Sequence, residues 1–467
     1  MRITNRKQLL LSLFFITISA SAQNLQQKLQ SAFGRLQQDS QSRYASASLT
    51  VLDAKTGEVL FAANPDMGLA PASTLKTVTS ATAMSLLGPD YRFKTTISDV
   101  NDSHLDATGT WVGDIAINAG NDPTLGSWRW EQTAEAVVLK EFVDGLKRAG
   151  IKKIGGSIIA TGVSHTPAGW IWQDVGNYYG AAPNNLCWHE NQYDILLKPG
   201  KVGQSVQVTG TVPQLPYLHI ENGLITGAAG TGDHAYAFLP VMGNVVFLNG
   251  TYSIDQQKRM ISAAIPDPPF ELARRLKDTL IKAGISVSGE PMSETMWIQK
   301  TNNADISYGR VFATHYSPPL RKIIYWLNQK SINLYAEQLI LAIADSAKTS
   351  NGVKVLQDFW KARGIDPESL NIADGSGLSP GDRVTTKTLA QILKIVKPET
   401  WFPDYYESLP TYNNMKMKSG TINNGLSFAG YQTKNGRELC FAIIINNYSG
   451  SSSAMRQKLF KVLDELK

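Results

Sequence analysis

Apolar residues recur every three or four positions along many stretches of this 467-residue chain, with polar residues between them. This spacing places the apolar side chains on one face of an α-helix. We therefore expect helices over residues 26–37, 71–87, 131–149, 270–283, 320–329, 332–344, 352–363, 385–396 and 452–466.

Other stretches alternate apolar and polar residues, which is typical of β-strands with one buried face. Residues 47–62 indicate two strands joined by a turn at Lys55-Thr56-Gly57, and residues 426–432 and 439–446 indicate two more. Residues 192–265 contain short strands separated by Gly and Pro, with no long helical pattern. We expect a small all-β unit there.

These patterns change at about residues 89 and 305. At roughly 100–200 residues per domain, the length of the chain allows two to four domains. We expect an α/β domain that is split into residues 23–88 and 305–467. The insertion, residues 89–304, is β-rich, forms one or two extra domains and includes the all-β unit at 191–265.

The first 22 residues have the features of an export signal. Three basic residues lie within the first seven positions, residues 9–18 are mostly apolar, and Ala20-Ser21-Ala22 supplies the small residues that a signal peptidase requires. The apolar run is shorter than the roughly 20 residues that span a bilayer. A membrane anchor or a buried helix is the alternative. We expect an exported, soluble protein that begins near Gln23.

Composition and charge exclude several classes of protein. The chain has 17 Tyr, 15 Phe and 10 Trp, which supply enough apolar surface to exclude global disorder. The formal charge of +6 falls to +3 without the export signal, which is too little to indicate nucleic-acid binding. The six histidines never stand four positions apart, as they do in a zinc-binding helix. The sequence leaves open whether Cys187 and Cys440 pair.

Ser73 and Lys76 are the first candidates for catalysis. They follow Pro71 at the start of a predicted N-capped helix, where residues three positions apart share a face. A buried lysine loses its proton more readily and can accept the serine proton, which produces a nucleophile without histidine. The alternative is a serine that caps the helix beside a solvated lysine.

Ser331 and Asn333 are a second candidate pair. The asparagine amide can bind a substrate amide, and the serine can relay a proton to a leaving amine. Ser369 and Asn371 have the same spacing, so this pattern alone does not discriminate between the two pairs.

Lys418-Ser419-Gly420-Thr421 is the third candidate motif. Its lysine and hydroxyls suit a carboxylate, and its glycine lets a substrate backbone approach the strand. Lys55-Thr56-Gly57 matches equally well in letters but lies in a predicted turn. The motif precedes two predicted strands, which places it on or beside a sheet edge where an extended peptide can pair.

Together and in this order, the three motifs resemble those of the penicillin-recognising serine acyltransferases, the penicillin-binding proteins and serine β-lactamases. The long separation of Ser73 from Ser331 is similar to that in the D-alanyl-D-alanine carboxypeptidase/endopeptidase family (penicillin-binding protein 4 type, low-molecular-mass class C). The resemblance covers nearly the whole mature chain. Flanking segments that agree are residues 121–125, Gly169-Trp170 with Asp174, 317–320, 333–337 and 374–379.

This resemblance implies a serine β-lactamase/transpeptidase-like α/β domain and an acyl-enzyme mechanism. It implies that Ser73 attacks the carbonyl between two D-alanines with Lys76 as general base. It also implies that Ser331 and Lys418 pass a proton to the leaving D-alanine while Asn333 holds the peptide.

The resemblance further implies how the substrate is bound. Ser419 and Thr421 would bind its terminal carboxylate beside Gly420, and the N–H groups of Ser73 and Thr421 would form the oxyanion hole. Asp174 would recognise a diamino acid side chain, with a structural role in a turn as the alternative.

The implied partners are peptidoglycan stem peptides, with β-lactam antibiotics as inhibitors. The resemblance implies no metal or organic cofactor, no nucleic acid and at most peripheral membrane contact, and a location in the periplasm or at the cell wall. One departure is that Leu409-Pro410 reaches Lys418 in eight residues, where relatives have a longer segment. We expect this shortening to affect substrate range more than chemistry.

Two alternatives stay open at this point. A serine β-lactamase would share the acyl-enzyme step but deacylate quickly, and the long insertion argues against it. A non-catalytic cell-wall-binding protein on the same fold would have no need of Lys76.

Overall fold

The computed structural model describes residues 24–101, 103–240 and 243–467, so the predicted export signal lies outside the described residues. The chain forms two compact units. Unit 1 comprises the described residues up to Leu86, Ile324–Ser331 and Asn351–Lys467, and unit 2 comprises Leu87–Ile323 and Ile332–Ser350. Residues 305–323 and 332–350, which follow the predicted insertion, therefore belong to unit 2 by their contacts.

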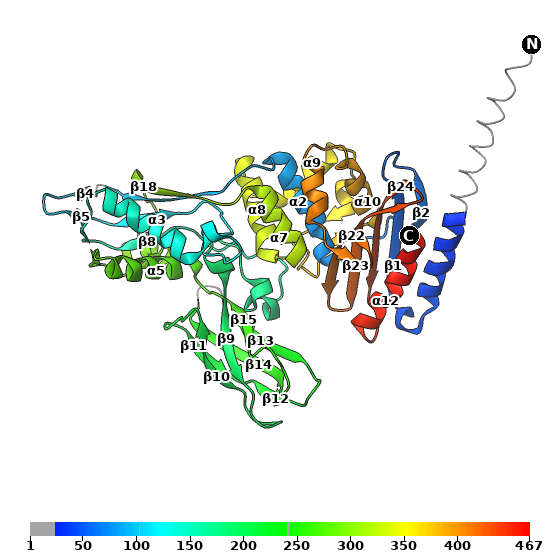
Figure 1. The fold of residues 1–467 in the computed structure, drawn as a ribbon, viewed down its shortest axis with the longest axis horizontal. Coiled ribbons are helices and arrows are strands. Elements are labelled where there is room, and N and C mark those ends of the chain that lie inside the picture. The colour runs from blue at the N-terminus through cyan, green and yellow to red at the C-terminus, as the bar shows by residue number, and fades with distance from the viewer. Residues whose placement is uncertain (1–23, 102, 241–242) are drawn as a thin grey trace, which may run out of the picture. The chain divides into compact units, whose positions relative to one another are not determined.

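Unit 1 is built on a six-stranded antiparallel sheet with the order β2-β1-β24-β23-β22-β21 (Figure 1). Its strands are β1 (Ser46–Asp53), β2 (Val59–Ala63), β21 (Thr411–Tyr412), β22 (Met415–Ile422), β23 (Gly425–Lys434) and β24 (Arg437–Asn446). All of β1 pairs with β24, so the first and the last of the described strands lie side by side in one sheet. The strands predicted in residues 47–62, 426–432 and 439–446 are confirmed.

Alternation along β1 separates the two faces of this sheet. Leu49 and Val51 point into a hydrophobic core on one face. Ser48 and Thr50 point to the other face, where their hydroxyls contact the Thr386 hydroxyl of α10 (Thr386–Ile395) at 2.5 and 2.9 Å. The polar positions of the strand thereby hold a helix against the sheet.

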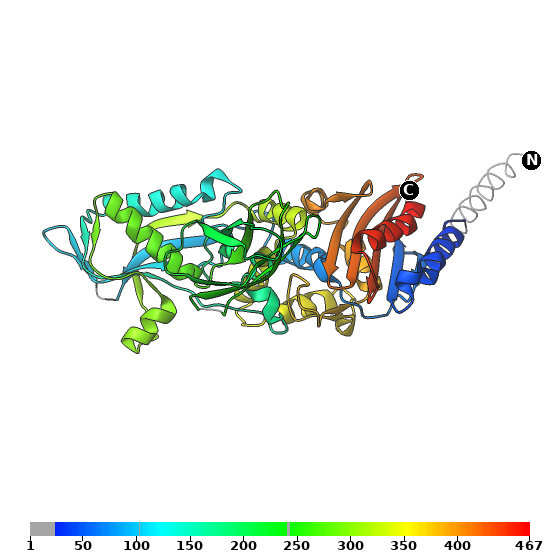
Figure 2. The ribbon, with the colours of Figure 1, turned by 90° about the horizontal axis from the view of Figure 1, so that it is seen from below.

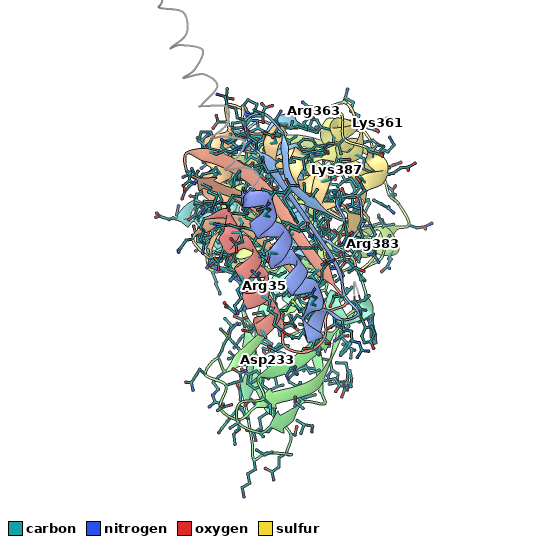
Figure 3. The ribbon with its side chains drawn as sticks, turned by 90° about the vertical axis from the view of Figure 1, so that its right-hand side faces the viewer. Arg35, Asp233, Lys361, Arg363, Arg383 and Lys387 are labelled. Atoms are coloured by element: carbon teal, nitrogen blue, oxygen red, sulfur yellow. The ribbon has the colours of Figure 1, made fainter. Side chains whose placement is uncertain are left out.

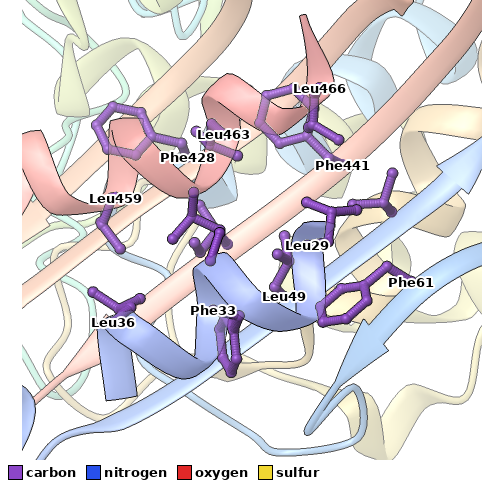
Figure 4. Close-up of a cluster of buried hydrophobic side chains, with 14 of the residues drawn as sticks. Leu29, Phe33, Leu36, Leu49, Phe61, Phe428, Phe441, Leu459, Leu463 and Leu466 are labelled. Carbon is purple, nitrogen blue, oxygen red and sulfur yellow. The ribbon is translucent and has the colours of Figure 1, made fainter. Parts of the chain in front are cut away.

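The hydrophobic core of unit 1 joins the first described helix, over residues 24–38, to α12 (Ser452–Leu463) and the sheet. Figure 4 shows Leu29, Phe33 and Leu36 of the first helix in one cluster with Leu459 and Leu463 of α12. Arg35 of the first helix is exposed (Figure 3), as the amphipathic pattern predicts.

Helices α2 (Lys76–Leu86) and α9 (Gly352–Lys361) also belong to unit 1. Helix α2 packs against α9 and α10, and the indole nitrogen of Trp360 on α9 donates a hydrogen bond to the Thr82 hydroxyl at 2.8 Å. Unit 1 also contains α7 (Leu320–Lys330, from Ile324 onward), α11 (Phe402–Ser408), β19 (Leu370–Asn371) and β20 (Arg383–Val384).

Unit 2 contains an α/β part. A five-stranded sheet has the order β17-β8-β6-β3-β18, a four-stranded sheet has the order β16-β7-β5-β4, and α3 and α5 pack against strands of the first sheet (Figure 2). The strands are β3 (Lys94–Val100), β4 (His104–Leu105), β5 (Thr110–Val112), β6 (Ile115–Asn118), β7 (Lys153–Ile154), β8 (Ile158–Ala160), β16 (Ser286–Val287), β17 (Met292–Ser293) and β18 (Tyr308–Tyr316). The helices are α3 (Glu135–Arg148), α4 (Trp172–Val175), α5 (Pro268–Lys282), α6 (Glu294–Thr301) and α8 (Asn333–Ser346).

Unit 2 also contains the expected all-β region. It consists of a three-stranded sheet, β10-β9-β15, and a four-stranded sheet in which β14 pairs with β11, β12 and β13. The strands are β9 (Gln192–Lys198), β10 (Gln207–Val212), β11 (His219–Asn222), β12 (Ile225–Gly227), β13 (Asp233–Phe238), β14 (Val245–Ser253) and β15 (Met260–Ala264).

Every predicted helix has a counterpart, whereas the short helices α4, α6 and α11 were not predicted. Helices of four to eight residues provide too few turns for the apolar periodicity to register. Among the described residues, no helix combines the length and the apolar character needed to cross a membrane.

Candidate active site

The chain turns sharply into α2 at Ser73. Residues Ala72–Leu75 form a 3-10 turn, and the α-helix itself begins at Lys76. Pro71 precedes the turn and no side chain caps it, so the predicted serine or threonine cap is wrong. Ala72 has a φ of +47°, a conformation that costs a non-glycine residue about 1–3 kcal/mol and occurs most often at functional sites.

The turn brings the Ser73 hydroxyl to the amine of Lys76. The Lys76 Nζ donates to Ser73 Oγ at 2.8 Å, and the Lys76 side chain is fully buried. The solvated lysine of the alternative interpretation is therefore excluded. An amine that is shielded from water and touches a serine hydroxyl is arranged to take its proton.

A buried loop, residues 374–379, holds Lys76 from the other side. The carbonyl of Ser376 accepts a hydrogen bond from Lys76 Nζ at 2.7 Å. The Asp374 carboxylate shapes the loop by accepting bonds from the N–H groups of Ser376, Gly377 and Ser379, at 3.1, 2.6 and 2.7 Å. In the sequence this segment stands out only by its resemblance to relatives, because the side chains around it do not reveal that a backbone carbonyl is the partner of Lys76.

Gly377 is required where this loop meets the nucleophile. Its φ is +79°, and an added Cβ would overlap the carbonyl oxygen of Ala72. Both the backbone conformation and the close approach favour glycine at this position.

Lys418 on β22 supplies a second buried amine. It donates to Ser331 Oγ and to the carbonyl of Ser419, each at 2.9 Å. Burial lowers the pKa of Lys418 well below its usual 10.5, and the nearby positive charge of Lys76 lowers it further. This amine is therefore suited to exchanging a proton with the Ser331 hydroxyl.

Strand β22 lies directly against the nucleophile turn at Gly420. A Cβ added there would lie 2.6 Å from the carbonyl oxygen of Pro71 and 2.9 Å from the amide nitrogen of Ser73. The partner of Gly420 in β23, Ser427, donates to the same Pro71 oxygen at 2.5 Å. Ser427 was not among the predicted residues, and its position opposite Gly420 in the strand register is the signal that identifies it.

The outer edge of β22 is open beyond the first residues of the strand. Strand β21 pairs only with Met415 and Lys416, and no other strand among the described residues pairs with this edge. Along it, Ser419 is half-buried and Thr421 is exposed. The predicted location of the motif beside a sheet edge is confirmed.

Ser331 lies in the link between α7 and α8, with a φ of +56°. The end of α7 is held by Asn328, whose amide donates to the Ser408 hydroxyl at 2.8 Å. Unit 1 thus brings together Ser73, Lys76, Ser331 and Lys418, which come from three separate segments of the chain.

Asn333 and Asp174 belong to unit 2. Asn333 begins α8 and its amide donates to the carbonyl of Tyr179 at 2.7 Å. Asp174, on α4, accepts a bond from the Tyr179 hydroxyl at 3.3 Å. Partial burial raises the pKa of Asp174, and the Tyr179 bond offsets part of this effect.

The two cysteines are free and buried. Burial raises the pKa of Cys440 to about 12 and also raises that of Cys187. Neither thiol has the low pKa of a reactive nucleophile.

Comparisons with known proteins extend over nearly the whole chain. The sequence model of the D-Ala-D-Ala carboxypeptidase 3 (S13) family matches residues 25–466. A D-alanyl-D-alanine carboxypeptidase of Actinomadura sp. (strain R39) is 25% identical over 447 residues, covering 87% of this chain and 78% of that protein. D-alanyl-D-alanine carboxypeptidase DacB of Haemophilus influenzae is 26% identical over 420 residues, covering 81% of this chain and 80% of that protein.

Solved structures agree at the level of the fold. The crystal structure of penicillin binding protein 4 from Haemophilus influenzae superposes with a TM-score of 0.73 at 20% identity, covering 94% of this chain and 97% of that chain. Its complex with a β-lactam superposes with a TM-score of 0.70. The predicted α/β fold with a large insertion is confirmed.

Proposed function

Since the chain belongs to the D-Ala-D-Ala carboxypeptidase S13 family, we propose that it cleaves the terminal D-alanyl-D-alanine bond of peptidoglycan stem peptides through an acyl-enzyme on Ser73. It is a serine DD-peptidase. The observation that carries the assignment of the nucleophile is the 2.8 Å hydrogen bond between the buried Lys76 amine and the Ser73 hydroxyl.

Acylation begins with transfer of the Ser73 proton to Lys76. The Ser73 oxygen then bonds to the carbonyl carbon of the penultimate D-alanine, and the negative charge moves to the carbonyl oxygen. The N–H groups of Ser73 and Thr421 receive this oxyanion. The close approach of Gly420 to the Ser73 amide supports this pairing of the two segments.

Collapse of the oxyanion breaks the carbon–nitrogen bond to the terminal D-alanine. The leaving amine takes a proton from Ser331, and Ser331 recovers one from Lys418. Lys418 receives in turn the proton that Lys76 took from Ser73, so all three side chains return to their starting protonation states. The 2.9 Å contact between Lys418 and the Ser331 hydroxyl supports this relay, as does the lowered pKa of Lys418. Water then attacks the ester and frees Ser73, with Lys76 as the base.

Four further side chains bind the substrate in this proposal. Ser419 and Thr421, on the open edge of β22, bind the terminal carboxylate, and Gly420 lets the peptide backbone come close. Asn333 holds a peptide amide. Asp174 is half-buried, carries a negative charge when ionised, and suits the ammonium of a diamino acid side chain.

The same chemistry accommodates two leaving groups. Release of a free D-alanine is carboxypeptidase action, and release of a cross-linked D-alanine is endopeptidase action. β-Lactams acylate Ser73 and leave slowly, and the β-lactam complex of the Haemophilus structure supports this sensitivity. Residues 1–22 direct the chain out of the cytoplasm to the periplasm or cell wall, where its substrate lies.

Labelling with a fluorescent penicillin and release of D-alanine from a stem pentapeptide test the proposal together. Ser73→Ala is expected to abolish both. Ser331→Ala and Lys418→Met are expected to lower both at least tenfold, about 1.4 kcal/mol in the barrier. The chain supplies matched controls with the same local letters: Ser369→Ala and Lys55→Met are expected to leave both rates unchanged.

Each outcome separates the proposal from its rivals. Rapid penicillin turnover without retained label would identify a β-lactamase. D-alanine release that survives Ser73→Ala would show that the nucleophile is assigned wrongly. Absence of both activities in the unaltered protein would favour a non-catalytic wall-binding protein.

A further inference from the structure

Helix α8, which begins with Asn333, is held by polar contacts inside unit 2. On its first turn, the Tyr335 hydroxyl donates to Glu190 Oε1 at 2.7 Å. On the next turn, the Gln338 amide donates to the carbonyls of Asn121 and Asn184 at 3.1 and 2.9 Å. Residues elsewhere in unit 2 therefore hold the helix that carries Asn333.

Glu190 is the centre of this attachment. Its carboxylate is 1% exposed and receives two bonds from Arg129, Nε to Oε1 at 2.7 Å and Nη2 to Oε2 at 2.9 Å. The Ser127 hydroxyl donates to Oε1 at 2.7 Å. A buried carboxylate with this many donors is fixed in position. Moving it would break these hydrogen bonds and separate two opposite charges that are shielded from water.

The backbone at Glu190 is held in an uncommon conformation. His189, Glu190 and Asn191 are consecutive and have φ values of +56°, +53° and +51°. Such conformations are unfavourable for residues other than glycine and persist only where the surrounding structure imposes them. Three in a row at the residue that receives the Tyr335 hydroxyl indicate that this segment is shaped for its contacts.

Tyr335 connects α8 to Glu190 through its hydroxyl hydrogen bond. It is fully buried, and burial together with the Glu190 charge raises its pKa well above 10, so the phenol keeps its proton and stays a donor. The Trp130 ring stacks on the Tyr335 ring at 6.5 Å between centroids. Only one residue separates Tyr335 from Asn333.

We propose that Arg129, Glu190 and Tyr335 are positioning residues that hold the first turn of α8 and thereby orient the Asn333 amide for the substrate peptide. This inference rests on the proposed function for the role of Asn333. It assigns Arg129, Glu190 and Tyr335 of unit 2 a part in acylation, because they place the substrate-binding amide.

Tyr335→Phe tests the proposal, because it removes one hydroxyl and keeps the ring. We expect kcat/KM for D-alanine release to fall about tenfold. In an Asn333→Ala background, the same substitution is expected to change kcat/KM less than twofold, because the side chain that it positions is gone. Tyr193→Phe is the matched control: Tyr193 is a buried tyrosine of unit 2 whose hydroxyl has no hydrogen-bond partner in the described part of the chain.

Hydrogen–deuterium exchange of the peptide covering residues 331–337 measures the positioning without using activity. Exchange is expected to rise in Tyr335→Phe and to be unchanged in Tyr193→Phe. If Tyr335→Phe does not fold, Glu190→Gln, which keeps an acceptor for Tyr335 but removes the charge that Arg129 pairs with, carries both measurements with the same expected direction.

Unaltered kcat/KM and exchange in Tyr335→Phe would overturn the proposal. Equal losses in the unaltered and the Asn333→Ala backgrounds would also overturn it, since they would indicate a purely structural effect. If the unaltered protein releases no D-alanine, the proposed function fails, and the exchange measurement alone decides whether the network positions α8.

Discussion

Replacing Gly420 by alanine tests whether the approach of β22 to the nucleophile turn is needed for acylation. The added methyl group would lie 2.6 Å from the Pro71 oxygen and 2.9 Å from the Ser73 nitrogen, and it would also overlap the Ser427 hydroxyl. Ordinary contacts of a carbon with these atoms exceed 3 Å, so strand and turn must separate by about 0.5–1 Å. Two of the three obstructing atoms are backbone, so no side-chain rotation relieves them.

The expected cost of this separation is mainly catalytic. A displacement of about 1 Å between reacting groups lowers rates about 100-fold, and overpacking costs about 1–3 kcal/mol of stability. We therefore expect fluorescent penicillin to acylate Gly420→Ala about 100-fold more slowly, measured as the second-order rate constant. Melting temperature should fall by only a few degrees.

Two companion variants sharpen the test of Gly420. Gly34→Ala is the matched control: its Cβ would have no neighbour within 4 Å and it lies in a helix, so no loss of rate is expected. The double variant Gly420→Ala/Ser427→Ala removes only the side-chain overlap and is expected to stay slow. An acylation rate of Gly420→Ala within threefold of the unaltered protein would refute the reasoning.

Three further predictions concern pH, reactivity and packing. The pKa of Lys418 is lowered in the folded protein, so between that lowered value and 10.5 the unfolded chain binds more protons than the folded one. The free energy of unfolding should therefore rise with pH across this window. Lys418→Met should flatten the slope in chemical denaturation, and Lys55→Met should not. Both thiols are buried, and the pKa of Cys440 is raised to about 12. A maleimide at pH 8 should therefore label neither cysteine in the native protein and both cysteines after denaturation. Labelling of the native protein, detected by mass spectrometry, would contradict this. Leu29 is fully buried, and Leu29→Ala should lower the free energy of unfolding by about 3 kcal/mol in chemical denaturation. The Leu86 side chain is 40% exposed, so Leu86→Ala should lower the free energy of unfolding by less than about 1 kcal/mol.

Local chemistry explains why much of the fold and part of the site could be predicted. The apolar periodicity of a helix and the alternation of a strand depend on neighbours a few residues away. The expected helices, and the strands expected in residues 47–62, 426–432 and 439–446, therefore lie within a few residues of their observed bounds. Ser73 and Lys76 are three positions apart at a helix start, so their contact follows from helix geometry.

Residue spacing could not predict the contacts between segments that lie far apart in the sequence. Lys418 meets Ser331 because the sheet and α7 place them together, and the carbonyl of Ser376 meets Lys76 because Asp374 folds a loop towards it. Every residue has a backbone carbonyl, so residue types do not reveal which carbonyl accepts the hydrogen bond from Lys76. The division of the chain at Ser331 was equally hidden, since Ser331 and Asn333 are two residues apart and belong to different units.

The spacing of residues in the sequence therefore determines the local structure of this protein. The reason is that each residue of a helix or strand adds a fixed rise and rotation, which sets the side chains that share a face. The depth at which an amine is buried depends on atoms hundreds of positions away along the chain. Burial of Lys418, and with it the lowered pKa on which the proposed proton relay depends, follows from packing of whole elements and becomes visible only when the chain has folded.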